Sequence, residues 1–301
     1  MWPILLMCHV LNVSTSGFYD FRGREPGVRA QRREQIKRDV QQVYDEHHGI
    51  YGSWKIADVM RQRDDLASAC RNTVALAMRE LGLKSRVCKT FKPTTTPADP
   101  GKRPAENVLQ QNFQADRPNH KWVTDITYID TDAGWVYLAA VMDCFSRKVV
   151  GWSINDSRVT EWVSDALRNA IEKRRPDIQN NELLHHSDRG CQYTSDAYQQ
   201  TLRTLGITCS MSRTGCCYDT PGAPGGAAME RFFWSLKQEW TNHHTYVDLT
   251  DARSSVFQYI ELFYNRKRIH QTLGYMTPEQ YETQHPREQA KAVHALETKV
   301  A

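Results

Sequence analysis

The first ninety residues carry three short runs of apolar positions at helical spacing. Apolar residues recur every three or four positions within 36–44, 56–60 and 74–81, a period that is typical of amphipathic helices. We expect Asn72 or Thr73 to cap the third helix and Gly82 to end it. Three short helices with a tight turn between the last two are compatible with a helix-turn-helix, although other three-helix bundles share this pattern.

From residue 121 onward the apolar pattern is that of strands interrupted by helices. The expected strands cover 121–129, 135–143, 148–154, 183–188 and 207–212. Helices are expected before the fourth and fifth strands, and two more follow the fifth strand. This order predicts an α/β, ribonuclease-H-like fold, with a mixed five-stranded sheet and flanking helices, preceded by a small all-α domain.

A proline-rich stretch separates the two patterns. Residues 91–107 hold four prolines and no periodic apolar set, which is typical of a linker. The domain organisation that we predict has five parts: an N-terminal segment (1–29), a helix-turn-helix-like DNA-binding domain (30–90), a linker (91–112), the ribonuclease-H-like core with C-terminal helices (113–285) and a tail (286–301).

Charge is distributed unevenly along the chain. Residues 22–103 contain 18 Lys and Arg against 10 Asp and Glu, a net of 18 − 10 = +8, whereas residues 104–301 give 21 − 24 = −3. A basic front and a mildly acidic back indicate an anion-binding module joined to a different kind of domain, with a solvated basic surface as the alternative. The eight cysteines lack the two-residue spacing of a zinc knuckle, and reduced thiols are the simplest interpretation.

Three acids fall where the predicted strand order would bring them together. Asp125 lies in the middle of the first strand, where Asp is disfavoured; Asp188 ends the fourth strand; Glu230 lies in the first turn of a helix. Taken singly, each acid is more often structural than catalytic, with Asp125 as a turn or cap residue and Asp188 as a loop acid. Converging carboxylates repel one another, and hard divalent cations are their natural ligands. Two such ions can activate a hydroxyl nucleophile and stabilise the leaving oxygen of a phosphodiester.

Several long motifs resemble one known family. WVTDITYI, DCFSRKVVGW, HHSDRGCQYTSDAY, GITCSMSRTGCCYD and MERFFWSLKQEW are similar to the integrase core of insertion-sequence transposases of the IS3 family, and FYNRKRIHQTLGYMTPEQYE matches its C-terminal motif. HHGIYGSWKIADVM and RNTVALAMRELGLKSR are similar to the helix-turn-helix segment of the family's second reading frame. The resemblance covers roughly residues 5–285.

The resemblance implies roles for particular residues. Asp125, Asp188 and Glu230 match the family's DDE triad, which is usually served by two Mg²⁺ ions, with Mn²⁺ as a possible substitute. Lys237 matches a basic residue that contacts DNA near the transferred end, with a solvated helix lysine as the alternative. Further candidate DNA contacts are Arg189 and Arg213, which are otherwise plain surface arginines, and Arg71, Asn72 and Lys84 near the third helix. A core position is expected for His185 and His186, and for Trp122, Trp135, Trp152 and Trp162.

The chain departs from the family pattern beside the third acid. Family members run from the Tyr-Asp pair directly into Asn-Ala, whereas here Thr220 to Gly226 stand between Asp219 and Ala227. The interval from Asp188 to Glu230 is therefore 230 − 188 − 1 = 41 residues, six more than the pattern expects. Because catalysis tolerates little misplacement, we hypothesise that this insert weakens or abolishes activity.

The resemblance predicts a DDE transposase that cleaves element ends and transfers their strands into target DNA. One alternative is a catalytically impaired DNA-binding or regulatory fragment that acts with an upstream-frame partner. Another is a ribonuclease-H-type nuclease, which the C-terminal motif and the basic front disfavour. Expected partners are DNA, further copies of the chain on paired ends, and an upstream-frame protein or frameshift fusion. Without a signal peptide or apolar span, the expected location is the bacterial cytoplasm, at the nucleoid.

Overall fold

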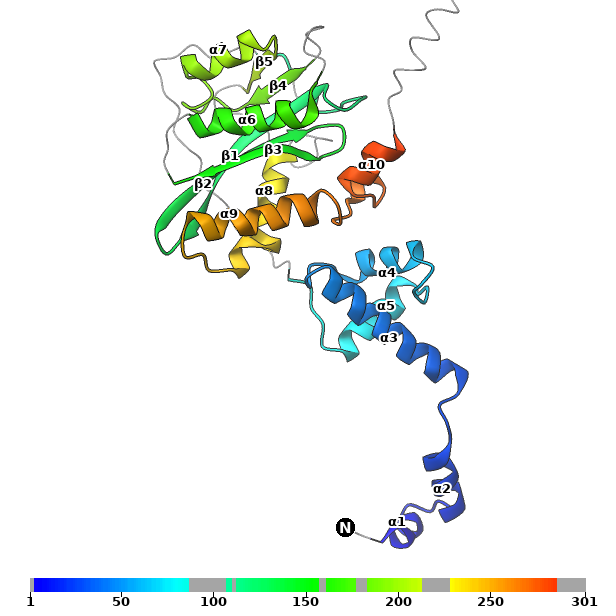
Figure 1. Ribbon diagram of the computed structural model, residues 1–301. Helices are drawn as coiled ribbons and strands as arrows, with labels where there is room; N and C mark the ends of the chain where they lie inside the picture. The colour runs from blue at the N-terminus through cyan, green and yellow to red at the C-terminus, as the bar shows by residue number, and fades with distance from the viewer. Residues whose placement is uncertain are drawn as a thin grey trace, which may run out of the picture. The chain divides into compact units, whose positions relative to one another are not determined.

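A computed structural model describes residues 3–86, 107–109, 112–156, 161–176, 183–212 and 228–285. The chain divides into two compact units, Met1–Ser85 and Arg86–Ala301 (Figure 1). Much of the predicted linker and the whole of the predicted tail lie outside the described residues. No helix in the described part is long and apolar enough to cross a membrane.

The first unit is entirely helical. Its elements are α1 (Ile4–Val10), α2 (Thr15–Gly23), α3 (Val28–Glu46), α4 (Ser53–Gln62) and α5 (Arg71–Glu80). Helices α3, α4 and α5 contact one another in all three pairs. Their shared core contains Val40, Ile56, Met60 and Val74, each with no exposed surface. The three predicted helices are therefore present and form one bundle.

The start of α5 differs from the prediction, whereas its end agrees. Cys70 precedes the helix in an extended conformation, and no side chain caps its first turn, so neither Asn72 nor Thr73 is the cap. At the other end Gly82 has φ +69°. The N–H groups of Gly82 and Leu83 donate to the carbonyls of Arg79 and Met78. This is a Schellman closure, which favours glycine at the position of positive φ.

The second unit is built on a five-stranded sheet. The strands are β1 (Lys121–Thr131), β2 (Gly134–Asp143), β3 (Val149–Asn155), β4 (Leu184–Ser187) and β5 (Thr208–Met211). They lie in the order β3-β2-β1-β4-β5. β1, β2 and β3 pair antiparallel, whereas β4 pairs parallel with β1 and with β5. The predicted mixed sheet is thus confirmed, and it makes β1 and β4 neighbours.

Helices cover the sheet. α6 (Glu161–Arg174) packs on β2 and β3, and α7 (Asp196–Thr204) packs on β5. A Cβ at Gly151 would lie 2.3 Å from the Ala166 carbonyl oxygen, so only glycine allows β3 and α6 to approach this closely. α8 (Ala228–Glu239) contacts β1, and α9 (Leu249–Phe257) contacts β1 and β3. A seven-residue π-helix, η2 (Gln258–Tyr264), continues α9.

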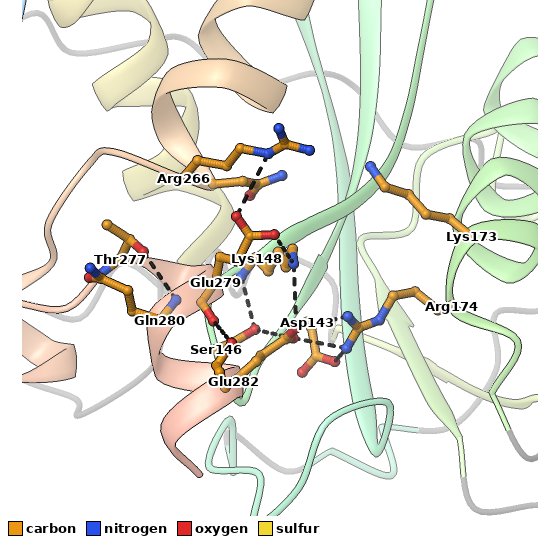
Figure 2. Close-up of polar contacts among 12 residues, drawn as sticks. Asp143, Ser146, Lys148, Lys173, Arg174, Arg266, Thr277, Glu279, Gln280 and Glu282 are labelled. Carbon is orange, nitrogen blue, oxygen red and sulfur yellow. Dashed lines mark hydrogen bonds and ion pairs between the residues drawn. The ribbon is translucent and has the colours of Figure 1, made fainter. Parts of the chain in front are cut away.

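The C-terminal helix α10 (Pro278–Gln284) is attached to the sheet by ion pairs (Figure 2). Glu282 accepts two hydrogen bonds from the guanidinium of Arg174 on α6, both 2.8 Å, and one from the hydroxyl of Ser146, also 2.8 Å. Asp143, fully buried at the end of β2, lies 3.5 Å from the same guanidinium. This polar cluster joins α6, the β2–β3 turn and α10.

Candidate active site

Asp125 occupies the middle of β1, on the strand face that also carries Val123 and Thr127. The residue is partly buried, and its Oδ1 accepts a hydrogen bond from the N–H of Ile126 at 2.7 Å. Burial, and then repulsion from Asp188, raise the pKa of Asp125 to about 7. A cation placed beside this carboxyl group would relieve both causes of the shift.

Asp188 is the first residue after β4, the strand that pairs in parallel with β1. Its Oδ1 accepts a hydrogen bond from the N–H of Gly190 at 2.9 Å. Burial raises the pKa of Asp188, and this hydrogen bond lowers it in part. A Cβ at position 190 would lie only 3.0 Å from the same oxygen, so glycine allows the loop to fold against the carboxylate.

The structure brings Asp125 and Asp188 within electrostatic reach of each other. The pKa of Asp125 responds to Asp188, and both acids, after burial, raise the pKa of the buried Tyr193 phenol. The Tyr193 hydroxyl lies 3.3 Å from the hydroxyl of Thr124, the residue before Asp125 on β1. The parallel pairing of β1 and β4 therefore produces the predicted juxtaposition of two acids.

Glu230 is placed differently. It lies in the first turn of α8, as predicted, and is exposed on a helix that contacts β1. Within the described residues, no three His, Cys, Asp or Glu side chains gather closely enough to hold a metal ion. The structure thus contains an acid pair and a third acid on a neighbouring helix, rather than one compact three-acid cluster.

Lys237 lies on the same helix and packs against an aromatic ring of β1. Its Nζ is 4.2 Å from the ring centroid of Tyr128, and burial lowers the pKa of Lys237. Tyr128 in turn meets Trp135 edge to face, with centroids 5.1 Å apart. Trp135 is 51% exposed, so the expectation that it belongs to the core is wrong. The strand position explains this, because Trp135 is the second residue of β2, beside the turn that joins β1 to β2.

The two histidines before Asp188 are core residues, as expected. His185 has no exposed surface, and its Nε2 lies 3.1 Å from the Tyr198 hydroxyl. His186 Nδ1 lies 2.9 Å from the Ser210 hydroxyl on β5. Burial lowers the pKa of His185 to about 3 and that of His186 to about 4, so both are neutral near pH 7. They fix β4 in the sheet and thereby the position of Asp188.

Of the two arginines predicted near the acids, the structure describes Arg189 and not Arg213. Arg189 follows Asp188, and its Nε donates a hydrogen bond to the Ser212 carbonyl at 2.6 Å, which ties the β4 and β5 ends together. Arg213 lies outside the described residues, as does the insert Thr220–Gly226.

The candidate DNA contacts of the first unit are all exposed. Arg71 begins α5, and its guanidinium lies 4.2 Å from the ring centroid of Trp54, which is 61% exposed. Asn72 follows it. Lys84 lies beyond the end of α5 rather than on it, and its carbonyl accepts a hydrogen bond from the Tyr44 hydroxyl at 2.7 Å. The contacts are therefore divided between the two ends of α5.

Sequence reasoning missed two residues near the acids. Gly190 shapes the Asp188 loop, and its place two residues after a strand-end aspartate is a signal that could have identified it. Tyr193 gives no such signal, because a tyrosine in a loop does not indicate which buried strand it will meet.

The sheet order, the helices around it and the acid pair at β1 and β4 define an integrase-core protein of the ribonuclease-H-like class. Family models described as "Integrase core domain" match residues 115–217 and 230–285, and one described as "HTH-like domain" matches residues 31–91. The helix-turn-helix-like unit and the integrase core are thus both confirmed.

Two curated relatives narrow this class to one family. The chain is 37% identical to transposase InsF for insertion sequence IS3A of Escherichia coli (strain K12), over 283 residues that cover 93% of this chain and 94% of the relative. It is 34% identical to the insertion element IS600 uncharacterized 31 kDa protein of Shigella sonnei, over 272 residues that cover 90% and 96%. The chain belongs to the IS3 family of insertion-sequence transposases, whose role is DNA transposition.

The chain is also similar to a solved structure. This is the HTLV-2 integrase catalytic core domain in complex with magnesium, at 17% identity and a TM-score of 0.41, covering 55% of this chain and 97% of that one.

Proposed function

We propose that the chain is a DDE transposase that uses divalent metal ions to cleave the ends of its insertion element and to transfer the 3′ ends into target DNA. The observation that carries this proposal is the acid pair. Asp125 lies in the middle of β1, and Asp188 directly follows β4, the parallel neighbour of β1. Burial together with mutual repulsion raises the pKa of Asp125 to about 7. Such a pair is costly to hold without a cation.

The donor set fits a hard divalent ion. Carboxylate oxygens are the ligands that Mg²⁺ prefers, with Mn²⁺ accepted by the same donors. Asp125 and Asp188 would hold the ion, with Glu230 as the third carboxylate of a two-ion centre. When bound, the ions supply Lewis-acid activation of a water or 3′-hydroxyl and stabilise the leaving oxygen.

The remaining residues orient the acids and the DNA. The Gly190 N–H directs the Asp188 carboxylate, and the neutral His185 and His186 keep β4 rigid. Lys237, seven residues after Glu230 and on the same helix face, would contact a phosphate near the reacting end. Arg189 and Arg213 would add phosphate contacts, and the unit with Arg71, Asn72 and Lys84 would bind DNA outside the core.

A substitution of Asp125 tests the proposal. We expect Asp125→Ala to abolish Mg²⁺-dependent nicking and strand transfer on DNA carrying the element end, while binding to that DNA stays within about twofold. The assay should include the upstream-frame protein in one arm, because the family's active enzyme is usually a frameshift fusion and functions as a multimer on paired ends. Strand transfer that survives the substitution would refute the role of the acid pair.

The position of Glu230 on α8, apart from the Asp125–Asp188 pair, favours a second candidate, a regulatory fragment that binds DNA without cutting it. In that case the wild-type chain would bind the element ends and inhibit an active family transposase, and Asp125→Ala would inhibit equally well.

A further inference from the structure

Arg268, which follows the π-helix η2, forms hydrogen bonds with two residues on the buried side of helix α8. Arg268 donates two hydrogen bonds to the Glu239 carboxylate, Nε to Oε2 at 2.7 Å and Nη2 to Oε1 at 2.6 Å. The same Nη2 donates to the Ser235 hydroxyl at 3.0 Å. Glu239 is 2% exposed, and the Arg268 side chain is 11% exposed. The guanidinium therefore binds α8 at two points, one helical turn apart.

Ser235 and Glu239, the two residues that Arg268 contacts, lie on the side of α8 opposite Glu230. At about 100° per residue, Glu239 is turned about 180° from Glu230, and Ser235 about 140°. Lys237 is turned only about 20° from Glu230, on the same face. Burial agrees with this division, because Ser235 and Glu239 are buried while Glu230 is exposed. Whatever fixes the back of α8 in rotation also fixes the direction of Glu230 on its front.

The π-helix η2 encloses this ion pair with aromatic rings. The Tyr259 hydroxyl donates to Glu239 Oε2 at 2.8 Å, and the Tyr264 ring centroid lies 5.5 Å from the Arg268 guanidinium carbon. A π-helix closes its hydrogen bonds between residues five apart, so it brings positions 259 and 264 onto nearly one face. Their ring centroids are 6.0 Å apart. A continuous α-helix would separate these two rings around its axis.

The carboxylate of Glu239 keeps the buried guanidinium of Arg268 charged. Burial opposes the charge of Arg268, but Glu239 outweighs it and the pKa of Arg268 is raised. Bidentate pairing with a carboxylate also has a narrow geometry, because the planar guanidinium presents its donors as a fixed fork. A lysine at this position would retain the charge and lose the fork.

We propose that Arg268 is a positioning residue, which sets the rotation of α8 through Glu239 and Ser235 and so fixes the direction in which Glu230 extends from the helix. This inference rests on the proposed function. Because side chains extend about 5–6 Å from a helix axis, a rotation of roughly 20° would move the Glu230 carboxylate by about 2 Å. Misplacement by about 1 Å can reduce a catalysed rate by about 100-fold.

Arg268→Lys is the informative variant. We expect kcat for strand transfer to fall about 10- to 100-fold, with KM for the DNA end within about twofold of wild type. Glu239→Gln, which retains the shape and loses the carboxylate, should act in the same direction. Equal losses in kcat and in the folded fraction, measured by circular dichroism, would overturn the proposal, because they would indicate a general loss of structure.

Arg174→Lys is the matched control. Arg174 makes an equally bidentate, largely buried pair with Glu282 on α10 (Figure 2), and its other contacts are with Asn119 and with Asp143 at the end of β2. We expect it to lower thermal stability about as much as Arg268→Lys while leaving kcat of the folded protein unchanged. A loss of kcat as large as that of Arg268→Lys would overturn the specific role of Arg268.

Amide hydrogen exchange decides the inference without an activity assay. Arg268→Lys should speed exchange in the peptide covering 228–239 and leave peptides from β1 and β4 unchanged. Unchanged exchange in α8 would overturn the proposal. If the wild-type chain neither nicks nor transfers DNA, the proposed function fails, and the exchange result still determines whether Arg268 holds α8.

Discussion

At the scale of single residues, the chemistry of the site depends on how two carboxyl groups respond to burial. Burial raises the pKa of both Asp125 and Asp188, and a different backbone N–H group partly offsets it at each, that of Ile126 at Asp125 and that of Gly190 at Asp188. The difference follows from position, since Asp125 is inside a strand and Asp188 follows one, where the Gly190 N–H can reach it. The pKa values of the two aspartates in this pair are therefore set by different local contacts.

The raised pKa of Asp125 predicts a pH dependence of stability. Its folded pKa of about 7 exceeds the model-peptide value of 3.8, so the folded state binds the proton more tightly. The stabilising contribution of Asp125 is therefore complete below about pH 4 and is lost as pH rises through 7. Asp125→Asn removes this loss, and we expect it to raise Tm of the metal-free protein by about 2–4 °C at pH 8 and by less at pH 5.

Differential scanning calorimetry in the presence of a chelator measures both Tm values. Asp130→Asn is a suitable control, since Asp130 lies exposed on the same strand. An equal change in Tm at the two pH values would show that the Asp125 proton is not the cause.

At the scale of elements, α8 is the part of the site with the most demanding placement. Its buried side is fixed by Arg268, and its first residues follow the insert that distinguishes this chain from its family pattern. The family pattern has an Asn where the insert stands, and an Asn that caps a helix contributes about 1 kcal/mol. We therefore hypothesise that the insert removes a cap from α8.

The insert predicts a gain of activity on its removal. Replacing Thr220–Gly226 by a single Asn restores the family spacing, and we expect strand transfer to rise at least about tenfold, because Glu230 would then be held from both ends of α8. The measurement is strand transfer per folded protein at saturating Mg²⁺. A variant in which the seven residues are shuffled serves as control, and absence of a gain would refute the hypothesis that the insert impairs this copy.

Most elements of the core could be predicted from the sequence, because alternation and helical spacing reflect burial directly. Asp125 and Asp188 became neighbours once the strand order was inferred. The predicted cap of α5 at Asn72 or Thr73 was wrong, because Cys70 precedes the helix and no side chain of that residue caps it. The η2 π-helix gave no periodic signal that we recognised, and the Arg268–Glu239 pair was not predictable, since it joins residues 29 positions apart in the sequence.

At the scale of the whole molecule, basic charge is concentrated in residues 22–103, whereas the acid pair lies in the second unit. The first unit carries Arg71, Asn72 and Lys84 on its surface, with Arg71 held against Trp54. A stacked guanidinium is already ordered before DNA arrives, which reduces the entropy lost on binding. The proposed DNA contacts lie in the first unit and the proposed catalytic acids in the second. DNA binding and strand transfer can therefore be tested independently.

We expect Arg71→Ala and Lys84→Ala each to weaken DNA binding and to reduce the slope of log affinity against log salt by about 1, as expected for the loss of one phosphate contact. Fluorescence anisotropy at several salt concentrations provides the slope. Arg61→Ala is the control, because the Arg61 side chain is 65% exposed but already pairs with Asp58 at 2.9 Å. A slope that responds to Arg61 and not to the other two would place the DNA elsewhere.

The attachment of α10 to the sheet has a consequence for how the protein is made. Asp143 and Arg174 belong to strands and helices that leave the ribosome early, yet Glu282 completes their ion-pair cluster more than one hundred residues later. A nascent or truncated chain that lacks Pro278–Gln284 would leave the Arg174 guanidinium without its bidentate acceptor and the Ser146 hydroxyl without the carboxylate to which it donates. Element copies that lose their 3′ end would therefore yield protein that cellular proteases remove, rather than a stable fragment that interferes with intact transposase.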